Sequence, residues 1–230
     1  MRENGPAAFF RATSRCFRDA IQARHGQAGL IGALCALAFD SFDKTVPALP
    51  LAPRLSCERE CSGCSRLRAA ATAPEILLLA HFLYGIERRA AAKSDGAAQR
   101  RDHLWNCPLV ENGLCRAHRL RPLACRGLAC LGALDCGKRA CAADGEDNEA
   151  WPSKPHLLVR SLVQTSMMNA LRYEGMSWGL YEIAAGLRIA RDAPLAAREW
   201  LSGGDPLAPA SAPEFDRQRA AAIFDTIDRL

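Results

Sequence analysis

Nine of the eleven cysteines lie between residues 57 and 141, and this clustering is typical of metal ligation. A first group has the form C-x3-C-x2-C and consists of Cys57, Cys61 and Cys64. Gly63 permits a tight turn there, which would direct several thiolates at one ion. A second group is spread more widely and consists of Cys107, Cys115, Cys125, Cys130, Cys136 and Cys141. The clustering in polar segments favours ligands over buried thiols of a hydrophobic core.

The expected metal ligands are Cys57, Cys61, Cys64, Cys107, Cys115, Cys125 and Cys136. Structural zinc takes four ligands and a [4Fe–4S] cluster usually takes four thiolates, so the surplus allows two sites or one site with additional thiols. The net charge of +6 over residues 57–141 suits an anionic cluster and slightly favours iron–sulfur over zinc. A redox dithiol at Cys61 and Cys64 is a weaker interpretation, because no strand–helix alternation surrounds it. The odd number of cysteines argues against a disulfide framework.

Two arginines, Arg121 and Arg126, flank Cys125 and are the candidate cofactor-binding residues. They would offset thiolate charge and donate hydrogen bonds to loop carbonyls, or they would bind an anionic substrate. We favour the first role, because arginines paired with charge are common near anionic sites. His118 follows Cys115 at the spacing of a C-x2-H pair, although a surface histidine is the better interpretation.

Helices must position these groups. The sequence predicts two helices between Pro6 and Val46 that break at Gly26, followed by a connector at Pro47, Pro50 and Pro53. Thr72-Ala73-Pro74-Glu75 has the capping-box pattern and opens a helix that runs to about Lys93, and a short basic helix to His103 follows. Residues 105–141 are expected to form loops with short helices at most, with Trp105 covering the site.

The helical pattern returns after the acidic stretch Asp144 to Asn148. Ser153 and Pro155 begin one helix, whose apolar positions are Leu158, Val159, Leu162, Val163 and Met167. Further helices are predicted at about residues 177–191, around Trp200 and Leu201, and from the capping pattern Ser211-Ala212-Pro213-Glu214 to Leu230. The expected fold is mostly α: one helical domain, residues 1–230, with an irregular cysteine-rich metal-binding insert at 57–141 between N-terminal helices (1–56) and C-terminal helices (142–230).

Composition excludes several classes of protein. The chain has 230 residues, 49% of them hydrophobic and 24% charged, which is typical of a globular protein. The longest uncharged apolar run, residues 28–39, is 12 residues long, whereas a bilayer span needs about 20. The first residues are broken by Gly5 and Pro6 and do not form a signal peptide, so we expect a cytoplasmic protein. The 26 arginines are scattered, which argues against a nucleic-acid partner.

The order of motifs resembles the YkgJ-type cysteine-cluster family, a zinc- or iron-chelating domain to which flagellin lysine N-methylase is related. The matching segments are Cys57-x3-Cys61-x2-Cys64, Thr72-Ala73-Pro74-Glu75, Cys107-Pro108-Leu109, Asn112-Gly113-Leu114-Cys115, Arg121-Pro122-Leu123-Ala124-Cys125-Arg126-Gly127 and Cys136. They cover about residues 57–136, and Trp200-Leu201-Ser202-Gly203 is similar to bacterial members less distinctively. The resemblance implies a metal or iron–sulfur centre in a mostly helical protein.

The chain departs from the family pattern at three positions. Ser65 stands where the family has a cysteine directly after the one at Cys64, His118 stands at a usual tyrosine, and Cys130 at a usual hydroxyl residue. Cys130, Cys141 or His118 could replace the ligand missing at Ser65. The leading hypothesis is therefore a metal-binding protein. The alternatives are an enzyme that uses the centre, either redox or similar to protein lysine N-methylases, and a zinc-scaffolded interaction module.

Overall fold

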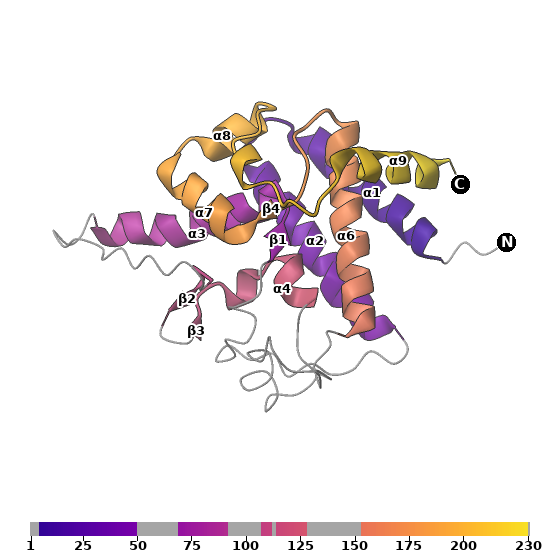
Figure 1. Ribbon diagram of the computed structural model, residues 1–230, viewed down its shortest axis with the longest axis horizontal. Helices are drawn as coiled ribbons and strands as arrows, with labels where there is room; N and C mark the ends of the chain where they lie inside the picture. The colour runs from indigo at the N-terminus through magenta and orange to yellow at the C-terminus, as the bar shows by residue number, and fades with distance from the viewer. Residues whose placement is uncertain (1–4, 50–68, 92–106, 112–113, 128–152, 230) are drawn as a thin grey trace.

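The computed structural model describes residues 5–49, 69–91, 107–111, 114–127 and 153–229 (Figure 1). This part of the chain is mostly helical, as the sequence predicts. The expected metal-binding insert falls largely outside it, so that part of the fold prediction stays a prediction. Within the described ranges, no helix is both long enough and apolar enough to cross a bilayer.

The first two helices are α1 (Pro6–Arg24) and α2 (Gly29–Ala48). Gly26 lies between them at a φ of +69°, a left-handed conformation that glycine adopts without strain, which confirms the predicted break. The helix was predicted to end before Pro47, but Pro47 lies inside α2, so the helix is longer than predicted. A proline in the last turn removes one hydrogen bond only, and the chain still closes that turn with a bond from the Leu49 amide to the Val46 carbonyl.

The central helix, α3 (Ala73–Ala91), follows the two-residue strand β1 (Ala70–Ala71). Its predicted start is confirmed, because the Glu75 carboxylate reaches back to the amide of Thr72 at 2.9 Å. The Thr72 side chain does not accept the amide of Glu75 as expected. Its hydroxyl instead donates to the same carboxylate oxygen at 2.8 Å.

Helix α6 (Lys154–Tyr173) begins directly after Ser153, as predicted. Val159, Val163 and Met167 are buried on it, whereas Leu158 is 49% exposed. The predicted apolar positions therefore include a residue, Leu158, that lies outside the buried face of α6. Figure 1 shows α6 lying beside α1 and α2, and both helices contact it along their length.

Helix α7 (Ile183–Asp192) starts six residues later than predicted, because the preceding residues form strand β4 (Tyr181–Glu182). This strand pairs antiparallel with β1, so that Ala70 faces Glu182 and Ala71 faces Tyr181. The pairing holds the start of α3 against the start of α7. A hydrophobic pattern alone does not reveal a strand of two residues.

The last helices are α8 (Ala196–Leu201), which contains Trp200 as predicted, and α9 (Arg217–Asp228). The capping pattern expected at Ser211 does not open α9. Residues 208–210 form the short 3₁₀-helix η3, and the side chain of Asp216 caps α9 by accepting the Arg219 amide at 2.9 Å. The cap is therefore Asp216, the acidic residue directly before the first residue of α9.

The main core lies where α1, α2, α3, α6, α7 and α8 meet. Its largest fully buried side chains include Trp200, Tyr181, Phe17, Ile21, Ile76 and Leu123. A smaller cluster of Phe10, Met168 and Phe224 lies under α9. In Figure 1 the short helix at residues 123–127 lies beside α6, and the two short strands at residues 110–111 and 114–115 lie below α3.

Two glycines provide a matched test of this packing. A methyl group at Gly186 of α7 would lie 2.9 Å from Cδ1 of the buried Ile76, whereas at Gly32 of α2 it would meet nothing within 4 Å. We expect Gly186→Ala to lower the free energy of unfolding by about 1–2 kcal/mol, because overpacking outweighs the gain in helix propensity. Gly32→Ala should raise it by about 0.5–1 kcal/mol. Urea denaturation of both variants measures this, and two changes of the same sign would contradict the packing.

Tyr181 provides a pH-dependent test of the core. Burial raises its pKa to about 12 from the ordinary value of 10.0, and its hydroxyl donates to Asp205 at 2.9 Å. Because the unfolded chain loses this proton at lower pH, the stabilising contribution of Tyr181 should fall as the pH rises from about 10 to about 12. Stability measured against pH should decline less steeply in this window for Tyr181→Phe. Parallel curves for the two proteins would contradict the raised pKa.

Candidate metal centre

Three of the seven predicted metal ligands lie in the described part of the chain: Cys107, Cys115 and Cys125. The other four, Cys57, Cys61, Cys64 and Cys136, lie outside the described residues. The same holds for Trp105, Cys130 and Cys141 and for the substituted position Ser65. The described part of the candidate centre comprises residues 107–111 and 114–127.

A small hairpin brings Cys107 and Cys115 together. Strands β2 (Val110–Glu111) and β3 (Leu114–Cys115) are antiparallel, with Val110 facing Cys115. The Val110 amide donates to the Cys107 carbonyl at 3.1 Å and so turns the chain before β2. Leu109 and Ala117, each 1% exposed, fix the base of this hairpin in the main core.

The two thiols of the hairpin are close enough to influence each other. Burial raises the pKa of Cys107, and the charge of Cys115 raises this pKa further, while a hydrogen bond from the Leu109 amide opposes the shift. Two neighbouring buried thiolates repel one another and lose hydration. Such a pair is stable as neutral thiols or as thiolates that share a cation.

The third thiol belongs to the five-residue helix α4 (Leu123–Gly127). Cys125 is half-buried, and its neighbours Leu123 and Ala124 are buried in the interior. In Figure 1, α4 and the β2–β3 hairpin lie on the same side of the helical body. Among the described residues, however, no group of three or more histidine, cysteine or acidic side chains is arranged to hold a metal ion. A complete ligand set would have to include predicted ligands beyond these residues.

Arg126 is held by four groups of the protein itself. Its Nη1 donates to both carboxylate oxygens of Asp43 on α2 at 2.7 Å, and its guanidinium lies 4.4 Å from the centre of the Phe39 ring. Its Nε donates to the carbonyl of Arg121 at 2.9 Å and its Nη2 to that of Arg119 at 3.1 Å. The side chain thus joins the segment before α4 to α2 and donates to loop carbonyls, as one of the two predicted roles requires.

Arg121 and His118 lie in the turn before α4, where His118–Leu120 forms the short 3₁₀-helix η2. The Nε of Arg121 donates to the His118 carbonyl at 3.1 Å. This bond shapes the backbone between Cys115 and Cys125. Ligation by His118 and cofactor binding by Arg121 and Arg126 stay predictions.

Glu75, which is only 1% exposed, joins the start of α3 to the segment that carries Cys125. Its Oε2 accepts from the amide and the hydroxyl of Thr72, and its Oε1 accepts from the amide of Leu123 at 2.7 Å. Burial raises the pKa of Glu75, while hydrogen bonds from Leu123, Thr72 and Gln164 oppose the shift. The capping-box pattern identified the bond to Thr72, but no local pattern reveals a bond to a residue 48 positions away.

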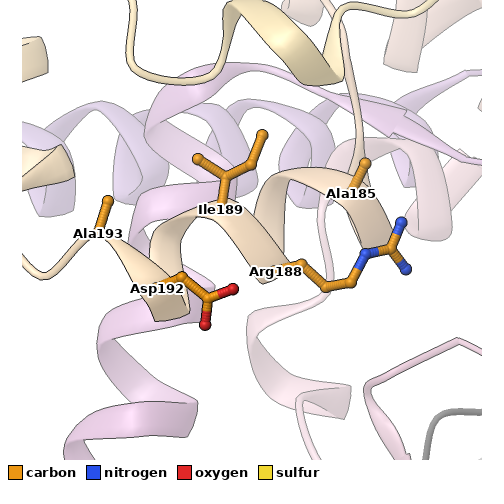
Figure 2. A pocket seen from close by; sticks show the side chains of 5 residues that line it. All are labelled: Ala185, Arg188, Ile189, Asp192 and Ala193. Carbon is orange, nitrogen blue, oxygen red and sulfur yellow. The ribbon is translucent and has the colours of Figure 1, made fainter.

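A shallow hollow beside α7 is the other candidate site, and Figure 2 shows its lining. It is lined by Ala185, Arg188, Ile189, Asp192 and Ala193. Asp192 already accepts from Arg191 at 2.8 Å in an exposed ion pair. The hollow therefore presents Arg188, an aspartate that is already paired with Arg191, and an apolar wall.

Comparison of the chain with protein-family models, with curated proteins and with solved structures finds no match. The resemblance to the cysteine-cluster family thus stays a prediction from the motifs, and the function must be argued from the geometry.

Arg126 offers a direct test of how the cysteine segment is attached. Arg126→Ala removes the bonds to Asp43 and to two carbonyls, and we expect the free energy of unfolding to fall by about 1–3 kcal/mol. Arg126→Lys keeps the charge but loses the planar fork, so its loss should be about half as large. Chemical denaturation checks both values, with Arg119→Ala as the control for an exposed arginine. Equal stability of wild type and both Arg126 variants would contradict an attachment role.

Proposed function

We propose that the protein binds a cysteine-ligated metal centre, either a [4Fe–4S] cluster or a zinc ion. The proposed ligands are Cys107, Cys115 and Cys125 together with Cys57, Cys61, Cys64 and Cys136. The observation that carries the proposal is the β2–β3 hairpin: Cys115 lies in β3, Cys107 lies three residues before Val110, the partner of Cys115, and both cysteines pack in or against the main core.

The chemistry of the donors supports this function. Thiolates are ligands that zinc and iron–sulfur clusters share, and a short hairpin with two cysteines presents them from a well-defined backbone. Cys107 and Cys125 are both half-buried and pack against the main core rather than projecting freely into solvent. Apolar surroundings of this kind would protect a thiolate–metal bond from water.

Hydrogen bonds of the protein itself hold the cysteine-bearing elements in place. The hairpin is stabilised by the Arg116 amide, which donates to the Leu109 carbonyl at 2.8 Å, and α4 is attached to α2 through Arg126. A bound centre would supply a cross-link between the cysteine segments, so its binding free energy would add to the stability of the fold.

Anaerobic purification followed by iron, sulfide and zinc analysis tests the proposal. We expect either about four iron and four sulfide per chain for each cluster, with broad visible absorption, or stoichiometric zinc in a colourless protein. A folded protein that carries none of these elements, and that takes up neither zinc nor a reconstituted cluster, would overturn the proposal.

Serine variants identify the ligands. The double variant Cys115→Ser and Cys125→Ser should lose most of the metal, because serine is a poor ligand for both centres. Cys16→Ser is the matched control, since Cys16 is exposed on α1, and Cys35→Ser is a second one, since Cys35 is buried in α2. Metal content measured by elemental analysis should stay at the wild-type level in both controls. Full occupancy in the double variant would show that the ligand assignment is wrong.

A further inference from the structure

The Glu75 carboxylate does more than cap the start of α3, because it also binds a distant segment of the chain. It is buried, and its two oxygens serve different parts of the chain: Oε2 accepts from Thr72 at the start of α3, and Oε1 accepts from the Leu123 amide at the start of α4. The first bond is local, whereas the second spans 48 residues that include Cys107 and Cys115. Glu75 therefore links the central helix to the helix that carries Cys125.

Helix α4 depends on such external contacts. It has five residues, and helices of this length are not stable by themselves in water. Its first amide is bonded by Glu75, and Arg126 is bonded by Asp43. At its end, Gly127 packs so closely on α6 that a methyl group there would lie 2.6 Å from Cδ of Arg160. These three contacts determine the direction of α4, and the Glu75 contact is the one nearest its start.

Cys125 lies two positions after Leu123, within the same turn of α4. A shift of the Leu123 amide would therefore rotate or translate the Cys125 thiol relative to the hairpin that holds Cys107 and Cys115. We propose that Glu75 is a positioning residue for the candidate metal centre, which sets the place of the Cys125 thiol through the Leu123 amide. This inference rests on the proposed metal-binding function.

Glu75→Gln tests the link selectively. A carboxamide keeps the shape of the side chain but has one acceptor oxygen, and its NH₂ group would face a donor. Two donors of Thr72 converge on one carboxylate oxygen, the amide of Leu123 meets the other, and the side chain of Gln164 also donates to the carboxylate. The amide oxygen should therefore stay with Thr72, so that the hydrogen bond to α4 is the one that breaks. Asp205→Asn is the matched control, because Asp205 accepts from Tyr181 and Arg217 at a site that carries no cysteine.

The first measurement uses the metal-free protein. We expect the alkylation rate of Cys125, followed by mass spectrometry, to rise at least tenfold in Glu75→Gln and to stay within twofold of wild type in Asp205→Asn. Cys35, which is fully buried, reports on the fold and should stay protected in both variants. An unchanged Cys125 rate in a Glu75→Gln protein whose Cys35 is protected would overturn the positioning role.

The second measurement uses zinc(II) alone, titrated into metal-free protein against a chromophoric chelator. Glu75→Gln should bind zinc at least tenfold more weakly than wild type, while Asp205→Asn should match wild type. If wild type takes up neither zinc nor a reconstituted cluster, the proposed function fails, and the alkylation rates still decide whether Glu75 positions Cys125. If wild type binds and Glu75→Gln binds equally well, the positioning role fails and the metal function stands.

A third measurement needs no variant and decides the case in which Glu75→Gln does not fold. Leu123 is the first residue of α4, so its amide has no partner within that helix. We expect hydrogen exchange of this amide in the wild-type protein to be slowed at least a hundredfold relative to an unstructured peptide, because Glu75 accepts it. Exchange at the rate of an unstructured peptide would overturn the proposal.

Discussion

A buried carboxylate without an ion-pair contact among the described residues is expensive to place in a core, and Glu75 is such a group. Removal from water disfavours its charge, which raises the pKa, and donors directed at both oxygens offset part of that penalty. Those donors are the amide and hydroxyl of Thr72, the amide of Leu123 and the side chain of Gln164. Because Thr72 lies at the start of α3 and Leu123 at the start of α4, the carboxylate joins the starts of these two helices. This link helps to fix the position of α4, the helix that carries Cys125.

The long helices could be predicted because their signals are local. The break at Gly26, the capping interaction of Glu75 with Thr72 and the start of α6 after Ser153 each depend on residues within a few positions. The prediction was wrong where a distant partner overrides the local pattern. The residues before Ile183 pair with β1 instead of continuing α7 toward its N-terminus, and Ser211 bridges to Tyr181 instead of capping α9.

In the candidate site, too, local patterns were predictable and contacts between distant residues were not. Cysteine spacing predicted which residues could bind a metal, and the structure describes three of them: two in the hairpin and one in α4. The residues that attach this segment could not be predicted. Arg126 meets Asp43 across 83 positions, and Leu123 meets Glu75 across 48. Both contacts are specific hydrogen bonds between single groups, so they leave no periodic trace in the sequence.

These attachments have a consequence for how a metal could act on the fold. Helix α4 and the β2–β3 hairpin are too short to be stable by themselves, and each is joined to the helical core by contacts of the protein itself. These contacts restrict the backbone that carries Cys107, Cys115 and Cys125, and a restricted backbone loses less conformational entropy when its side chains become ligands. A metal at this place would stabilise the cysteine segment, but the helices α1, α2, α3 and α6 do not require it, because their own apolar faces bury one another. The fold thus combines a helical core that hydrophobic burial holds together with short cysteine-bearing elements, which are attached to this core by buried apolar residues and by hydrogen bonds such as the one from Leu123 to Glu75.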